Sequence, residues 1–95
     1  MNQLPAIHPG LFLNEILETL DFKQSVFARR IGVSPMRISH ILKGSRPVTA
    51  ELALLFGKAF QQSPQYWLNL QMDYELKTAK SRVVDKLKNL QPLAA

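Results

Sequence analysis

A helix stop followed within three residues by a helix start constrains this chain more than any other feature of its sequence. Gly32 suits the left-handed backbone that ends a helix, and Ser34-Pro35 pairs a capping hydroxyl with a proline fitted to the first helical turn. Apolar spacing on both sides predicts two short helices, over residues 24–31 and 35–42, joined by a tight turn at a steep angle. The side chains expected to pin these helices together are Ala28, Ile31, Val33, Ile38 and Ile41.

Three further helices follow from the same kind of signal. The first begins after His8-Pro9-Gly10, where His8 is expected to cap or turn the chain locally and not to bind a ligand. The fourth is capped by Thr49, and the fifth begins at Ser63-Pro64 and runs through about Lys77. The buried stripes are Leu13, Ile16, Leu17 and Leu20 in the first helix, and Leu52, Leu55, Phe56 and Ala59 in the fourth. We therefore expect an all-α chain that forms a single domain over residues 1–95.

The fifth helix carries apolar residues on two faces. Trp67, Leu70 and Tyr74 share one face, and Leu68, Met72 and Leu76 share another. Since a helix with two apolar faces usually contacts two things, we expect Trp67 in the core and the other face at a second subunit. Residues 64–80 are the expected dimer helix, with a candidate interface made of Tyr66, Leu68, Met72 and Leu76. Residues 81–95 form an expected C-terminal extension, in which Val83, Leu87 and Leu90 space a weaker amphipathic helix and residues 92–95 fray.

The amino-acid composition limits where in the cell the protein is expected to be. The chain has no cysteine, so disulfides and thiolate metal sites are excluded and a cytoplasmic location is expected. Residues 1–5 carry no basic segment and no long apolar run, so no signal peptide is expected. No stretch approaches the length needed to span a bilayer.

Charge is distributed unevenly along the chain, whose net charge is +5. Residues 22–46 contain six basic side chains and no acidic one, whereas residues 1–21 contain three acids and no base. A solvated helical surface would mix signs, so the acid-free block favours a surface that faces phosphates. Arg29 and Arg30 are adjacent and cannot both point at DNA, so at least one of them is expected elsewhere on the surface.

The second of the two short helices is predicted to read DNA. Packing of the pair against the core would leave its outer side chains free to enter a major groove. Arg37, Ser39 and His40 can bond base edges, and Met36 can contact a thymine methyl. Two alternatives stay open. The pair could be an αα-corner of an unrelated helical domain, or Arg37 and His40 could face solvent on a helix that touches only the DNA backbone.

Little in the sequence supports catalysis. The two histidines lie 32 positions apart, the glycines stand at helix ends, and no pair of carboxylates stands out. No zinc-protease pair, phosphate-binding loop or nucleophile–base set is present in the sequence. We therefore expect a protein that is not an enzyme and that uses neither a metal nor a cofactor.

On these residues the chain resembles a known family. Residues 24–44 resemble the helix-turn-helix of the phage-repressor superfamily (lambda-repressor-like, Xre), and the resemblance extends from about Ile7 to Ala79. The segments 8–10, 44–49 and, above all, 63–71 with 74–76 are similar to the HigA antitoxin branch. The resemblance implies a five-helix lambda-repressor-like fold with a C-terminal helical extension. It also implies a homodimer that binds the palindromic operator of its own operon as a repressor, and a partner that is a HigB-type mRNA-cleaving toxin.

The resemblance also assigns roles to individual residues. The base-contacting positions of the superfamily are occupied by Pro35, Met36, Ser39 and His40, with Arg37 beside them. The positions that contact the DNA backbone are occupied by Gln24, Lys43, Ser45 and Arg46, and Lys23 and Ser34 are expected to contact the backbone as well. The chain departs from the family at Lys23, where a capping serine or threonine is usual. It departs again at Pro35 and Met36, which replace a polar pair and leave the operator sequence open.

The surface that would meet a toxin is open between two candidates. One is the stripe of Val83, Leu87 and Leu90, and the other is the outer face of the first helix, whose acids are Glu15, Glu18 and Asp21. The acidic face would complement a basic ribonuclease. The alternative functions are a solitary helix-turn-helix transcriptional regulator without a toxin partner, and a pure protein-binding module on the same scaffold.

Overall fold

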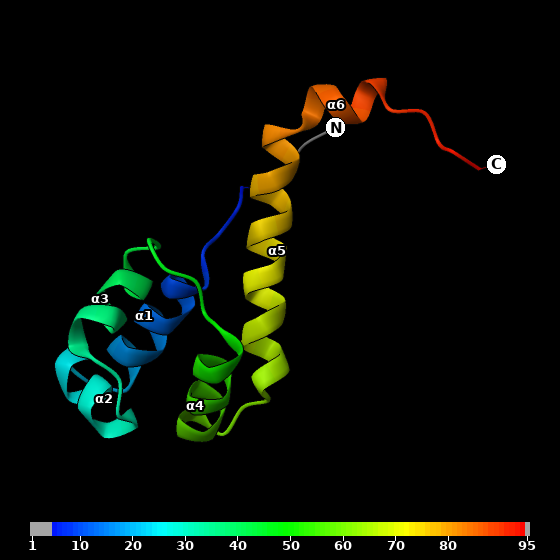
Figure 1. Ribbon diagram of the computed structural model, residues 1–95. Coiled ribbons are helices and arrows are strands. Elements are labelled where there is room, and N and C mark those ends of the chain that lie inside the picture. Colours follow the sequence, from blue (N-terminus) through cyan, green and yellow to red (C-terminus); the bar gives the residue numbers. More distant parts are fainter. Residues whose placement is uncertain (1–4, 95) are drawn as a thin grey trace.

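The computed structural model describes residues 5–94, and every regular element within that range is a helix (Figure 1). The elements are α1 (Pro9–Thr19), α2 (Gln24–Ile31), α3 (Pro35–Leu42), α4 (Ala50–Phe60), α5 (Pro64–Arg82) and α6 (Val84–Asn89). The all-α class and the C-terminal helical extension are confirmed. Residues 1–4 and residue 95 lie outside the described residues. The first four belong to the stretch predicted to hold no signal peptide, and residue 95 belongs to the predicted frayed end. Among the described helices, none combines the length and the apolar character needed to cross a membrane.

The helix boundaries follow from the local signals in the sequence. Gly32 adopts a φ of +74° and ends α2, and Ser34 Oγ accepts a hydrogen bond from the Arg37 amide at 3.2 Å to cap α3. Thr49 caps α4 in the same way. Lys23 offers no side-chain cap to α2, as its departure from the usual capping residues predicts. The starts of α3 and α4 and the end of α2 therefore depend on interactions or backbone preferences within a few residues of the helix end.

An aromatic cluster joins α2, α4 and α5 within the core. The rings of Phe27 and Phe60 stack with centroids 5.3 Å apart, and Phe56 meets Trp67 edge to face at 5.1 Å. Trp67 has no exposed surface, which confirms its predicted place in the core, and its Nε1 donates to Gln62 Oε1 at 3.0 Å. The cluster fixes the start of α5 against α4, because both ends of the indole are held.

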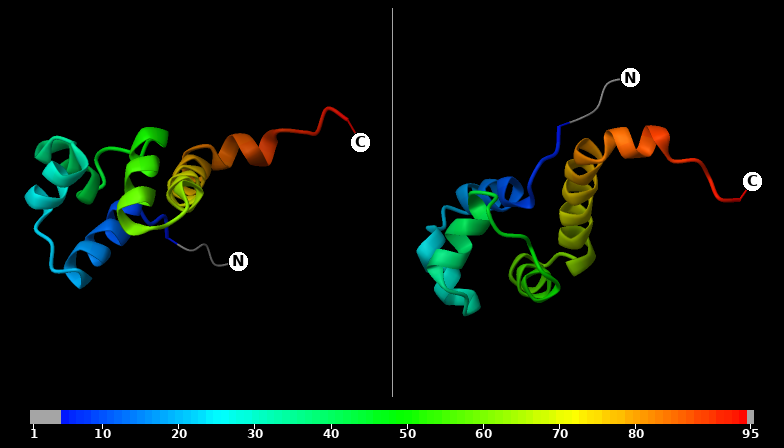
Figure 2. Two further views of the ribbon diagram at one scale, coloured as in Figure 1. Left: turned by 90° about the horizontal axis from the view of Figure 1, so that it is seen from below. Right: turned by 45° about the horizontal axis from the view of Figure 1, so that its top comes forward.

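The long helix α5 extends beyond the core. Its first half packs against α4, while its second half and α6 lead away from the other helices, and the molecule measures 51 × 22 × 22 Å (Figures 1 and 2). No residue of α6 is buried. The helix continues to Arg82, beyond the end predicted near Lys77, because residues 78–82 contain neither glycine nor proline to stop it. Among residues 5–94, no element covers a long surface of α5 and α6.

Candidate nucleic-acid interface

Close packing against α1 holds α3 at the surface with one face outward. Ile38 and Ile41 are fully buried on its inner side, as is Ala28 of α2. Gly10, at the start of α1, lies so near the α3 backbone that a Cβ there would overlap the carbonyl oxygen of Ile41. In both figures α2 and α3 form the end of the molecule opposite α6. The outer side of α3 is therefore open and its position is fixed by backbone-level contact.

The five predicted base-reading residues lie on α3 at different depths. Pro35 and Met36 are exposed, and Met36 keeps 68% of its surface accessible. Arg37, Ser39 and His40 are half-buried. The first turn of α3 therefore presents an apolar tip, and the polar candidates stand nearer to the rest of the domain.

The predicted DNA-backbone residues all lie on the surface around α3. Gln24, Ser39 and Lys43 line one hollow together with Asn14 and Glu18 of α1. Five of the six basic residues in the acid-free block are exposed, and Arg37 is the exception. The exposed members of the predicted backbone set are Lys23, Gln24, Ser34, Lys43, Ser45 and Arg46.

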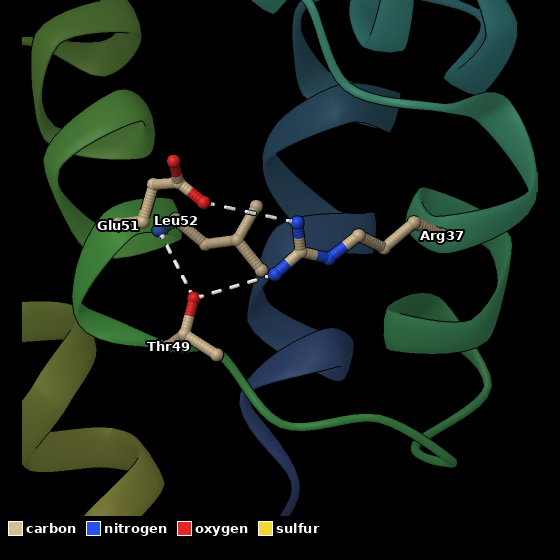
Figure 3. Close-up of polar contacts among 4 residues, drawn as sticks. All are labelled: Arg37, Thr49, Glu51 and Leu52. Carbon is tan, nitrogen blue, oxygen red and sulfur yellow. Dashed lines mark hydrogen bonds and ion pairs between the residues drawn. The ribbon is translucent and has the colours of Figure 1, made fainter.

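Arg37 extends from α3 toward the N-terminus of α4 (Figure 3). Its Nη2 donates to Thr49 Oγ1 at 3.5 Å, and its Nη1 lies 3.9 Å from Glu51 Oε1. Thr49 Oγ1 also accepts the Leu52 amide at 3.3 Å as the cap of α4. The guanidinium that the sequence favours for reading guanine is thus engaged with its own chain in this structure.

Arg30 has a different environment from the other basic residues of the acid-free block. Its guanidinium carbon lies 5.6 Å from the centroid of the Phe22 ring, at a distance suited to a cation–π contact. It also lines an apolar hollow between α2 and α4. Of the two adjacent arginines, this one therefore has a contact within the protein.

Comparison with known proteins assigns the two short helices and their turn to a family. A profile described as helix-turn-helix matches residues 13–67, more than half of the chain, and includes all of α2, the turn and α3. The chain belongs to the helix-turn-helix family. Members of this family are regulators and antitoxins, which are not a class of enzymes.

Solved relatives place the chain in the HigA antitoxin branch of the helix-turn-helix family. An addiction-module antidote protein of the HigA family from Coxiella burnetii is 36% identical with a TM-score of 0.89, over 94% of this chain and 99% of that one. Antitoxin HigA from Pseudomonas aeruginosa, solved with the higBA promoter, is 33% identical with a TM-score of 0.88, over 93% and 98%. Virulence-associated protein I of Dichelobacter nodosus is 40% identical over 80 residues, which cover 83% of this chain and 74% of that protein.

In this helix-turn-helix protein His8 contacts the start of α1, the helix α5 and the loop that follows α3. Its Nδ1 accepts the Gly10 amide at 2.9 Å and caps α1, which confirms the predicted local role. Its ring meets that of Tyr74 on α5 edge to face, with centroids 4.9 Å apart. Burial lowers the pKa of His8, and a hydrogen bond with the Arg46 backbone opposes that shift. The neutral ring is therefore the form that fits, since a protonated Nδ1 could not accept the Gly10 amide.

Sequence reasoning missed Gln71, which connects α5 to the loop before α4. Gln71 is buried; its Oε1 accepts the Val48 amide at 2.8 Å, and its Nε2 donates to Glu75 Oε2 at 2.8 Å. Val48 lies in the loop that also carries Ser45 and Arg46. The available signal was the position of Gln71 four residues after the buried Trp67, which puts a polar side chain on a buried helix face.

The predicted dimer face is only partly open. Tyr66, Met72 and Leu76 are exposed, whereas Leu68 is half-buried and packs against the core. Further along, Leu76 and Val83 help to line an apolar hollow where α5 meets α6. In the described part of the chain, no group of three or more His, Asp or Glu side chains is placed to hold a metal ion.

Proposed function

We propose that this chain is a DNA-binding antitoxin that reads the operator of its own operon with α3. The observation that carries the proposal is the open outer side of α3. It is bordered by exposed lysine and arginine side chains, in a stretch of 25 residues that contains no acidic residue. Lys23, Lys43 and Arg46 would contact phosphates, which position a protein on DNA, and residues of α3 would meet base edges, which specify the sequence. The Pseudomonas aeruginosa relative solved with promoter DNA supports this use of the fold.

The proposed repressor is a homodimer. One short helix contacts too few bases for useful specificity, whereas two copies about 34 Å apart can read both halves of a palindrome on one side of the duplex. Exposed Met72 and Leu76 on α5, with Tyr66 and the accessible part of Leu68, support α5 as the dimer helix. Sedimentation at high protein concentration tests this step, and a monomer there would refute it.

The proposed partner is a HigB-type toxin that cleaves mRNA. Glu15, Glu18 and Asp21 are all exposed along α1 and the turn after it, in a segment, residues 1–21, that contains neither lysine nor arginine. Such a surface complements a basic ribonuclease. Reversal of the three acids to lysine should weaken toxin binding, with an unchanged melting temperature as the check on folding. If the triple reversal leaves toxin affinity unchanged, the other candidate surface is the one to test. That surface is the apolar stripe of Val83, Leu87 and Leu90.

A mobility-shift titration with the DNA directly upstream of the chain's own operon tests operator binding. The variant His40→Ala/Lys43→Ala removes one candidate base contact and one candidate phosphate contact from α3. We expect it to weaken specific binding at least about tenfold with an unchanged melting temperature. The control is Lys58→Ala, which removes an exposed base from the far end of α4 and should change affinity less than about twofold. The proposal fails if folded, dimeric protein gives no specific shift at low salt.

A further inference from the structure

Among the six basic residues of the acid-free block, residues 22–46, Arg37 is the one for which the described part of the chain supplies an acidic partner. Figure 3 shows both terminal nitrogens of its guanidinium directed at α4, one toward Thr49 Oγ1 and the other toward Glu51 Oε1. One third of the Arg37 side chain is exposed, against 77% of the Glu51 side chain. The contact therefore connects the reading helix to the N-terminus of the next helix at the protein surface.

This arrangement limits what Arg37 can do for DNA. A guanidinium recognises guanine by donating two parallel hydrogen bonds, and the edge between its terminal nitrogens is one of the edges that can do so. In this structure that edge faces Thr49 and Glu51. Full engagement with a base through that edge therefore requires Arg37 to leave both partners.

The contacts of Arg37 with Glu51 and Thr49 are weak enough for the guanidinium to leave them for a DNA base. A separation of 3.9 Å between Nη1 and Oε1 is an ion pair and not a short hydrogen bond, and 3.5 Å to Thr49 is at the long end of the hydrogen-bond range. Exposed ion pairs of this kind shift an equilibrium constant by about 1.4- to 5-fold. The pair thus modulates the availability of Arg37 without preventing its release.

We propose that Glu51 competes with operator DNA for Arg37 and thereby lowers the affinity of the protein for its operator. This inference rests on the proposed function, because it needs α3 to be the DNA-reading helix. Glu51 is then an affinity-determining residue that acts through Arg37 and does not itself touch a base. Thr49 holds the second nitrogen of the same guanidinium while it caps α4.

The test is a double-mutant cycle read by fluorescence anisotropy with a duplex of the region upstream of the operon. It uses the wild type, Glu51→Gln, Arg37→Met and the double variant. Each half-site should gain about 1.4- to 5-fold in affinity when Glu51 becomes glutamine, so two half-sites should gain about 2- to 25-fold. In the Arg37→Met background the gain should fall to near one, because the competed residue is gone.

A matched control separates this effect from simple repulsion between an acid and DNA. Glu18 lines the hollow that holds Gln24, Ser39 and Lys43, and its charge is therefore close to the proposed DNA surface. Glu18→Gln should produce the same small change with Arg37 present or absent. Thermal melting of every variant checks folding, since Glu51 also stands in the favourable first turn of α4.

Two results would overturn the inference while leaving the proposed function in place. One is an equal gain from Glu51→Gln in both Arg37 backgrounds, which would mean repulsion alone. The other is no gain, or a weaker affinity, in the wild-type background, which would mean that Glu51 does not compete. Absence of operator binding by the wild type would instead refute the proposed function, and the inference with it.

Discussion

Replacing Gln71 by methionine should destabilise the protein by about 2 kcal/mol. Methionine has nearly the same unbranched shape but lacks the amide oxygen, so the Val48 amide is deprived of the acceptor that lies 2.8 Å away. Val48 is 2% exposed, which leaves its N–H without access to water. An unsatisfied buried group costs about 1–3 kcal/mol. For a chain of this size a destabilisation of about 2 kcal/mol corresponds to a fall of roughly 8–16 °C in melting temperature.

Urea denaturation followed by circular dichroism measures the destabilisation, at one protein concentration because association would shift the curve. Gln65→Met is the matched control on the same helix. Gln65 is exposed and its side chain donates only to Asn69, so its replacement should stay within about 0.5 kcal/mol of the wild type. Amide exchange at Val48 should also accelerate in Gln71→Met. A destabilisation below about 0.5 kcal/mol would refute the claim that Gln71 stabilises the loop before α4.

Three further outcomes are expected. Gly10→Ala should cost about 1–3 kcal/mol, because its Cβ would overlap the Ile41 carbonyl and push α1 from α3; an unchanged urea midpoint would contradict this. Burial lowers the pKa of His8 below its usual 6.5, so stability should be constant above that pH and fall below it, where the unfolded chain takes up the proton first. His8→Asn should flatten that dependence below pH 6.5, and equal slopes in both proteins would argue against His8 as the cause. Lys43→Ala should reduce the slope of log affinity against log salt by about one for each phosphate that Lys43 neutralises, measured by anisotropy, whereas an unaltered slope would place Lys43 away from phosphate.

The helices and the turn between α2 and α3 were predictable because their determinants are local. The hydroxyl of Ser34 and the backbone of Gly32 act within three residues of the ends that they set. Trp67 was predictable as a core residue from the apolar spacing around it. The end of α5 was predicted too early, since continuation through Arg82 depends on the absence of any breaker and not on a positive signal.

The sequence by itself determined the all-α fold, the cap of α1 by His8 and the exposed outer side of α3, because capping, helical periodicity and φ preference act over a few residues. Only the tertiary structure decided the partners of Arg37 and Gln71. Arg37 meets Thr49 twelve positions away, and Gln71 meets Val48 across 23 positions. Such contacts depend on how α3, α4 and α5 pack, and a side chain that looks free in the sequence acquires its partner only when that packing is complete.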